Sequence, residues 1–359
     1  MPLSISNLPA SLRTSISNGT VIPAHPLALT QKRTLDVRRQ RALTRYYIDA
    51  GAGGLAVGVH TTQFAIREAG LYAEVLRLAT DTARNWEGQR PKNSAPLAMI
   101  AGLVGRTDQA KREADTAADL GYHAGLLSLG AWRGASEDDI IEHCRAISER
   151  IPLFGFYLQP AVGGVPLSVG FWRRFVEIEN VIGVKIAPFN RYATIDVIRG
   201  VALARAEDRI ALYTGNDDHI LLDLLTPFIV DRARERVVLR IRGGLLGHWS
   251  VWTKSAVALF RRCHAAAAQD LVPSDLLAED SKVTACNAAI FDVANNFHGV
   301  IAGCHEVLRR QGLLAGTWCL DPREGLSPGQ AEAIAEVARS FPELTDDDFV
   351  LSNLERWLE

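Results

Sequence analysis

Short apolar runs alternate with longer amphipathic stretches through most of this chain, and that alternation limits its possible folds more than any other feature. Each apolar run precedes about 15 to 25 residues with helical periodicity, and two of these stretches, 35–51 and 107–121, close on glycine. Apolar strands that alternate with helices indicate a parallel sheet covered by helices. We expect strands at 21–29, 53–59, 95–103, 124–129, 152–158, 181–187, 209–215 and 236–241. Eight such units over about 250 residues predict a (β/α)8 TIM barrel.

The pattern changes after residue 270, where only amphipathic helices follow, at 273–295, 297–312, 327–341 and 346–358. The sequence therefore predicts two parts. Residues 1–270 form the barrel with a short N-terminal segment, and residues 271–359 form a helical bundle packed on it. An open α/β sheet is the alternative fold, but no GxGxxG motif follows the first predicted strand.

Composition excludes several classes of function. The formal net charge of −2 predicts no binding to nucleic acid or to an anionic membrane. No apolar run approaches the roughly 18 residues of a membrane span, and the polar N-terminus lacks the apolar core of a secretion signal. Neither the five cysteines nor the histidines show zinc-binding spacing. We expect a cytoplasmic protein without metal or other cofactor.

Lys185 lies in the run VIGVKIAPF (181–189), which is otherwise wholly apolar. Catalytic groups of a barrel lie at the C-terminal ends of the strands, and Lys185 falls near the end of the sixth. Burial lowers the pKa of an amine, and a partly neutral amine is the nucleophile that forms a Schiff base with a carbonyl. The alternatives are a lysine that reaches solvent along its apolar stem and one that pairs with a carboxylate inside the barrel.

Two further segments place polar side chains near the same predicted mouth. Tyr157 ends the fifth strand, 28 residues before Lys185, and a phenol there could transfer protons. Its alternative is a core aromatic residue with a hydrogen-bonded hydroxyl. Thr61 and Thr62 directly follow the second strand, where their hydroxyls and nearby backbone N–H groups could hold a carboxylate.

These elements, in this order, resemble the dihydrodipicolinate synthase and N-acetylneuraminate lyase family of class I aldolases over about residues 20–270. In that family a strand-six lysine forms a Schiff base with pyruvate, and Lys185 in GVKIA matches it. Tyr157 in YLQP matches the tyrosine of a YNxP-like motif. Thr61 and Thr62 in HTTQF match the threonines of a GTTGE turn that grips the pyruvate carboxylate. The resemblance also implies a homo-oligomer, which apolar helix faces such as 297–308 favour.

Two glycine-containing segments extend the resemblance. YTGNDD (213–218) resembles a glycine-plus-acid segment of the family, and RGGLLGHWS (242–250) resembles the glycine-rich turn after strand eight. The resemblance therefore implies that Gly215 and Gly244 contact substrate. His60 replaces the first glycine of the GTTGE turn. Three roles are open for it: a substrate contact, an acid/base group or a hydrogen-bonded structural histidine.

The remaining departures concern the second substrate. Val162 stands where the synthases carry an arginine that grips that substrate, and Trp132 stands near the place of a tyrosine pair that relays protons. Gln63 and Phe64 replace the last two residues of the GTTGE turn. The sequence thus predicts retained Schiff-base chemistry in a reshaped pocket.

We accordingly expect a Schiff-base lyase or aldolase that uses pyruvate or a related 2-keto acid and an aldehyde or sugar-acid substrate. We do not expect dihydrodipicolinate synthase activity itself. One alternative is a keto-deoxy sugar acid dehydratase with the same lysine. Another is a non-catalytic keto-acid-binding homologue, although a binding protein has no need of a costly lysine in an apolar strand.

Overall fold

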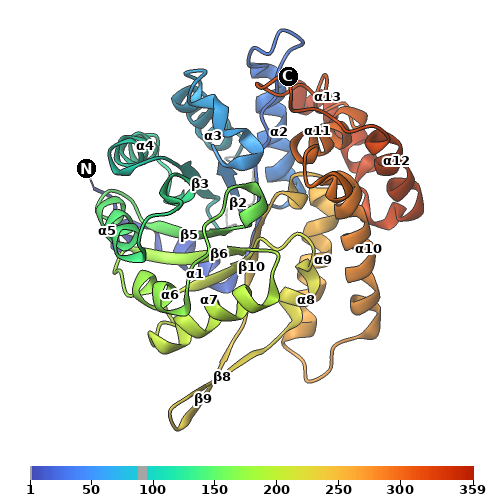
Figure 1. Cartoon of the computed structure of the whole chain (residues 1–359). Helices are drawn as coiled ribbons and strands as arrows, with labels where there is room; N and C mark the ends of the chain where they lie inside the picture. The colour runs from blue at the N-terminus through green and yellow to red at the C-terminus, as the bar shows by residue number, and fades with distance from the viewer. Residues whose placement is uncertain (1, 88–94) are drawn as a thin grey trace.

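Eight parallel strands form the barrel in the computed structural model, whose described residues are 2–87 and 95–359 (Figure 1). A bridge between Ala24 and Ala56 joins the two ends of the sheet, so the predicted (β/α)8 fold is confirmed. The strands, in their order around the sheet, are β1 (Val21–Pro23), β10 (Gly243–Leu246), β7 (Ala211–Thr214), β6 (Val181–Ala187), β5 (Leu153–Leu158), β4 (Ala124–Leu127), β3 (Ala98–Leu103) and β2 (Gly54–Val57).

Helices surround the barrel, and their ends follow local sequence signals. Asp36 caps the first of them by accepting a hydrogen bond from the Arg39 N–H, and Gly51 ends it at φ 95°, a left-handed conformation that suits glycine. The surrounding helices are α2 (Val37–Ala50), α3 (Tyr72–Glu87), α4 (Thr107–Asp119), α5 (Glu137–Ser148), α6 (Val169–Val176), α7 (Arg191–Leu203), α8 (Ile220–Leu225) and α9 (Thr253–Ala267).

The N-terminal helix α1 (Ala10–Asn18) closes the end of the barrel opposite the C-terminal strand ends. Its buried Leu12 and Ile16 pack with inward side chains of the strands, such as Ile22. The Tyr213 hydroxyl on β7 donates to the Ile16 carbonyl at 2.9 Å. In the part of the chain that the structure describes, α1 therefore covers this end of the barrel.

The eighth barrel strand is not the predicted one. The run at 236–241 belongs mostly to β9 (Glu235–Leu239), which pairs with β8 (Phe228–Arg232) in an antiparallel hairpin that projects from the barrel (Figure 1). The barrel strand is β10, which begins with two glycines. Glycine is a poor strand former, but a Cβ at Gly243 would lie 2.5 Å from the Tyr213 ring, so this close packing requires it.

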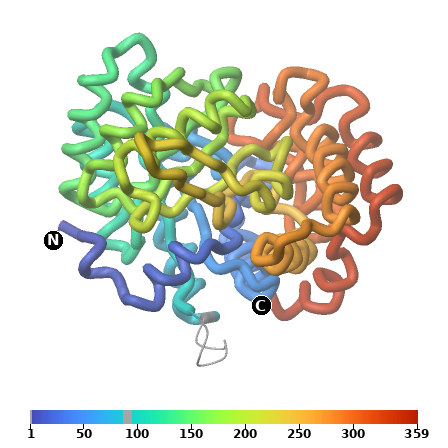
Figure 2. The backbone as a smooth tube through the Cα atoms, turned by 90° about the horizontal axis from the view of Figure 1, so that it is seen from below, coloured from blue at the N-terminus to red at the C-terminus, as the bar shows by residue number. Residues whose placement is uncertain are grey.

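The C-terminal helices gather on one side of the barrel, where Figures 1 and 2 draw them in orange and red. The Tyr46 hydroxyl of α2 donates to Asp346 at 2.7 Å, and the Trp357 indole donates to Asp49 at 2.7 Å. The group comprises α10 (Ser274–Ile290), α11 (Val300–Arg310), α12 (Gln330–Ser340) and α13 (Asp347–Leu358). Among the described helices, none combines the length and hydrophobicity required to cross a membrane.

Candidate active site at the barrel mouth

A cavity of about 590 Å³, including its open mouth, lies at the C-terminal ends of the strands. Its position is the one that barrel enzymes use. It contains four of the predicted site residues, Lys185, His60, Thr61 and Gly215. The other lining residues are Phe156, Leu158, Gln159, Val162, Ala187, Phe189, Asp217, Gly247, Phe291, Phe297, Val300, Ile301 and Cys304.

Lys185 extends from β6 into this cavity and is only 8% exposed. Its ammonium nitrogen lies 4.4 Å from the centre of the Phe156 ring. Burial lowers its pKa from 10.5 to about 8, and the negative charge of Asp217 opposes that shift. Within residues 2–87 and 95–359, the amine makes no salt bridge and no hydrogen bond. An amine in this state is suited to nucleophilic attack.

Gly215 follows β7 and gives the lysine its space. A Cβ at this position would lie 2.5 Å from Cε of Lys185 and 2.7 Å from Cβ of Ala187. Any larger residue would therefore push the lysine stem out of its position. Gly215 lines the cavity directly beside Lys185, and its contact with substrate stays a prediction.

Asp217 is the residue that sequence reasoning did not select. It lines the cavity near Lys185, and its Oδ1 accepts a hydrogen bond from the His248 N–H at 2.8 Å. Burial raises its pKa from 3.8 to about 7, while Lys185 acts in the opposite direction. A carboxyl group that titrates near neutrality can both take and return a proton. The signal was present, because Asp217 belongs to the glycine-plus-acid segment after the seventh strand.

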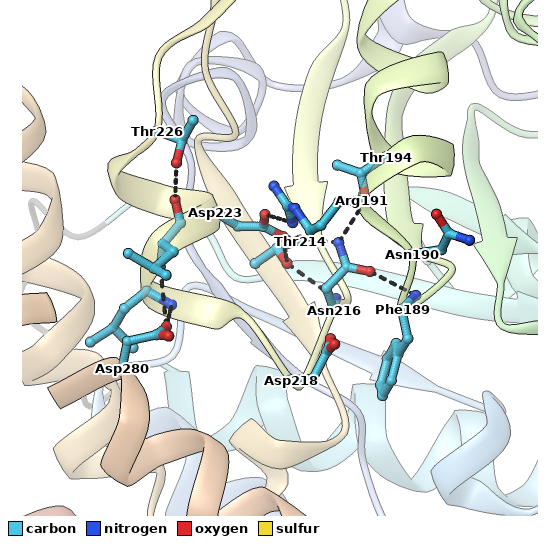
Figure 3. A network of polar contacts seen from close by, with 12 residues as sticks. Phe189, Asn190, Arg191, Thr194, Thr214, Asn216, Asp218, Asp223, Thr226 and Asp280 are labelled. Atoms are coloured by element: carbon cyan, nitrogen blue, oxygen red, sulfur yellow. Dashed lines mark hydrogen bonds and ion pairs between the residues drawn. The ribbon is translucent and has the colours of Figure 1, made fainter. Parts of the chain in front are cut away.

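A buried network fixes the loop that carries Gly215 and Asp217. Asn216 accepts from the Phe189 N–H at 3.1 Å and donates to Asp223 at 2.9 Å. Figure 3 shows it between the loop after β6 and helix α8. Thr214 also donates to Asp223 at 2.6 Å. Because Asn216 is bonded on both sides, the loops after β6 and β7 are held to one another.

The turn after β2 separates the two predicted threonines. Thr61 lines the cavity, but Thr62 does not: its hydroxyl donates to the His25 carbonyl at 2.6 Å and accepts from the Gly58 N–H at 3.0 Å. Thr62 therefore shapes the turn. His60 lines the cavity, and burial first, then Lys185, lowers its pKa from 6.5 to about 4. At neutral pH it is an uncharged imidazole.

The structure corrects the expected placement of Tyr157. Phe156 is the residue that pairs with Lys185, whereas Tyr157 pairs with Ile186. Successive side chains on a strand point to opposite faces, so Tyr157 faces the helices, with its ring 5.2 Å from that of Trp172. Its hydroxyl accepts from the Leu167 N–H at 3.2 Å. The alternative of a core aromatic with a hydrogen-bonded hydroxyl describes this placement.

Three other positions complete the comparison with the sequence predictions. Gly244 lies within β10 and not in a turn after it. A Cβ at this position would lie 2.5 Å from the Trp249 ring, and Gly244 is not among the residues that line the cavity. Gly247 lines it instead. Val162, which the sequence comparison with the synthases predicts to stand in place of an arginine, also lines it. Trp132 lies outside, with the Arg106 guanidinium 4.5 Å from its ring centre.

The side of the cavity facing the C-terminal helices is apolar and was not predicted. Phe291 follows α10, and Phe297, Val300 and Ile301 come from the start of α11 and the residues before it. The predicted tail thus contributes to the cavity as well as packing on the barrel. Among the described residues, no group of three or more His, Cys, Asp or Glu side chains is placed to hold a metal ion.

Comparison with solved structures supports the fold. A dihydrodipicolinate synthase from Bacteroides thetaiotaomicron matches with a TM-score of 0.73 at 17% identity, covering 91% of this chain and 99% of that one. A prophage protein of the dihydrodipicolinic acid synthase family from E. coli K12, solved with pyruvate, matches with a TM-score of 0.72 at 16% identity. It covers 91% of this chain and 98% of that one.

Sequence comparison identifies the family. The 4-hydroxy-tetrahydrodipicolinate synthase of Nitrosococcus oceani is 26% identical over 203 residues, or 55% of this chain and 61% of that protein. The N-acetylneuraminate lyase of Citrobacter koseri is 24% identical over 208 residues, or 57% and 65%. The chain thus spans less than two thirds of either relative. The family model described as "Dihydrodipicolinate synthetase family" matches residues 18–226. Because this match covers more than half of the chain, the protein belongs to the dihydrodipicolinate synthetase family.

Proposed function

We propose that this protein is a Schiff-base-forming lyase or aldolase that acts on pyruvate or a related 2-keto acid, with Lys185 as the nucleophile. The observation that carries the proposal is the buried amine of Lys185 in a cavity at the strand ends, with a pKa lowered to about 8 and without an ion pair among the described residues. Family membership supports the same class of reaction.

The proposed chemistry uses groups that line one cavity. The neutral amine of Lys185 attacks the keto carbon, and the carbinolamine loses water to give an iminium ion. A base then removes the proton of the C4 hydroxyl, the C3–C4 bond breaks, and its electrons flow to the iminium nitrogen. Protonation at C3 and hydrolysis by water release pyruvate and restore the amine.

We assign the proton transfers to Asp217, since it is the carboxyl group beside Lys185 and its pKa is raised to about 7. His60, neutral with a pKa of about 4, can donate or accept a hydrogen bond at the substrate. Thr61, whose side chain also lines the cavity, is assigned to the substrate carboxylate. Tyr157 receives no role, because its hydroxyl is bonded to Leu167 behind the barrel wall.

Reductive trapping tests the proposal. The protein is incubated with pyruvate and sodium borohydride, and the adduct is located by mass spectrometry of peptides. We expect one stable adduct at Lys185 and none in Lys185→Ala. Lys111→Ala on α4, away from the cavity, is the matched control and should trap normally. Trapping on another lysine, with Lys185→Ala fully active, would refute the mechanism, and binding without trapping would favour a non-catalytic homologue.

The same proposal excludes one reaction of the family. Condensation of pyruvate with aspartate semialdehyde requires a group for the semialdehyde carboxylate, and a bidentate arginine suits it. Among the described residues no arginine lines the cavity, and Val162 occupies the corresponding position. The purified protein should show little or no such condensation while still trapping a keto acid. A kcat/KM of about 10⁴ M⁻¹s⁻¹ or more for aspartate semialdehyde would contradict this.

A further inference from the structure

We propose that the part of the substrate beyond the keto acid, which leaves as the aldehyde, is an apolar group such as an aryl or branched alkyl chain. This inference rests on the proposed Schiff-base function and adds its substrate class. The cavity has two unlike sides. Lys185, Asp217, His60 and Thr61 form a polar floor, and an apolar roof, defined here as Phe189, Phe291, Phe297, Val300 and Ile301, faces it.

The roof is built into the fold. The ring of Phe189 meets the ring of Phe297 edge to face, with centroids 5.9 Å apart and an interplanar angle of 80°. This contact joins the loop after β6 to the C-terminal segment across the mouth. Phe189 has φ 50°, and its N–H donates to the side chain of Asn216 in the loop after β7. This hydrogen bond fixes the backbone position of Phe189.

Side-chain hydrogen bonds hold the other half of the roof. Asp292 accepts from the Gly299 N–H at 2.9 Å and from the Ser327 hydroxyl at 2.5 Å. Asp292, Asn296 and Phe297 all have positive φ, at 56°, 53° and 65°. Such strained backbone persists only where its surroundings determine it. The roof residues are therefore prearranged to contact a ligand.

The charges of the cavity disfavour a second anionic group on the substrate. Lys185 and Asp217 are the charged side chains among its described lining residues, and the proposed chemistry uses both. A second carboxylate on the substrate would meet Asp217 and no free cation. A polyol would lose hydration against the phenyl rings of the roof, where Gln159 is the amide side chain of the described lining that is left to bind it. An aryl or alkyl group would instead bury apolar surface on both sides.

Most of the roof also lies outside the part of the chain that the family model matches in sequence. The family match ends at residue 226, whereas four of the five roof residues lie between 291 and 301. The floor, which carries Lys185, lies within the matched region, and most of the roof lies in a region whose sequence the family model does not match. The reaction would cleave R–CHOH–CH2–CO–COO⁻ into R–CHO and CH3–CO–COO⁻, in which R is apolar and no oxidant or reductant is required.

Two 2-oxo acids with the same reactive head test the inference. In 2-oxo-4-phenylbutanoate the distal group is apolar, and in 2-oxoglutarate it is a carboxylate. Each is titrated against the full-length protein with cyanoborohydride, and the adduct at Lys185 is quantified by mass spectrometry. We expect half-maximal trapping at a concentration about 10-fold or more lower for the phenyl acid, the scale of discrimination that an apolar pocket achieves.

Two roof variants assign the preference. Val300→Thr keeps the shape and adds a hydroxyl to the roof, and Phe297→Ala removes a ring; each should reduce the preference for the phenyl acid several-fold while pyruvate still traps. Val293→Thr is the matched control, since Val293 is 43% exposed and does not line the cavity. Equal or tighter trapping of 2-oxoglutarate refutes the inference and leaves the Schiff base intact. Failure of every keto acid to trap on Lys185 refutes both proposals.

Discussion

Among single side chains, Lys185 gives the clearest pH dependence. Burial lowers its pKa to about 8, and the neutral amine is the reactive form, so the initial rate of reductive trapping should rise with pH and level off above about 8. Between pH 6 and pH 8 the neutral fraction, and with it the rate, should increase about 50-fold for a single titration.

The same experiment on Asp217→Asn provides its control. The Asp217 charge raises the pKa of Lys185, so its removal should move the midpoint to lower pH. A rate that still rises steeply above pH 10, as for an exposed lysine, would show that the amine is not desolvated in solution.

Gly215 tests the space around the same amine. In Gly215→Ala the new Cβ would lie 2.5 Å from Cε of Lys185, so the stem must move and trapping should fall at least 10-fold, because small misplacements at a reacting centre are costly. Gly170→Ala on α6 is the matched control, since its Cβ would lie 3.4 Å from the nearest atom. Equal trapping rates in the two variants would show that the stem tolerates the change.

At the level of strands and loops, the register of β5 decides the role of Tyr157. Its hydroxyl accepts a hydrogen bond from the Leu167 N–H, so Tyr157→Phe should cost about 1 kcal/mol of unfolding free energy and leave the trapping and turnover rates close to wild type. Chemical denaturation and single-turnover kinetics measure the two effects. A loss of 10²-fold or more in turnover would restore the acid/base role that the sequence pattern suggests.

Asn216 holds the loops after β6 and β7 together. Asn216→Ala leaves the Phe189 N–H without a buried partner and removes one of the hydrogen bonds to the Asp223 carboxylate, which keeps its bond from Thr214. We expect it to cost about 2 kcal/mol and to slow trapping at Lys185. Asn190→Ala, which removes the N-cap of α7, should cost about 1 kcal/mol without slowing trapping. If both variants trap at the wild-type rate, the network serves stability alone.

For the molecule as a whole, the predicted homo-oligomer now has a different basis. The apolar face of α11 that favoured it is buried within the chain, with Ile301 5% and Leu308 0% exposed. Exposed apolar side chains remain elsewhere, notably Tyr192 at 83%, and Ile229 at 60% beside Val238 at 56% on the projecting hairpin. We expect a multiple of 39.2 kDa by light scattering at micromolar concentration. A mass of one chain would overturn this prediction.

The strand-and-helix alternation alone determined the fold class and located Lys185 at a strand end, because apolar periodicity is local. The alternation did not predict the eighth barrel strand, because that strand begins with two glycines. Glycine is required at 243 because a Cβ there would clash with the Tyr213 ring of the neighbouring strand. The division of the chain at residue 270 stays a prediction.

The site divides in the same way. Lys185 and Thr61 could be selected from sequence because they lie near or just after the end of a predicted strand, whereas His60 and Gly215 were selected through the family resemblance. The sequence did not determine which face of the barrel wall Tyr157 occupies, because a one-residue difference in register moves a side chain to the opposite face. The register depends on how two strands pair and cannot be read from the sequence of either strand alone. The apolar roof was beyond reach for a related reason. Apart from Phe189, its residues lie about a hundred or more positions from Lys185 in the chain, and only the packing of α10 and α11 on the barrel brings them to the cavity.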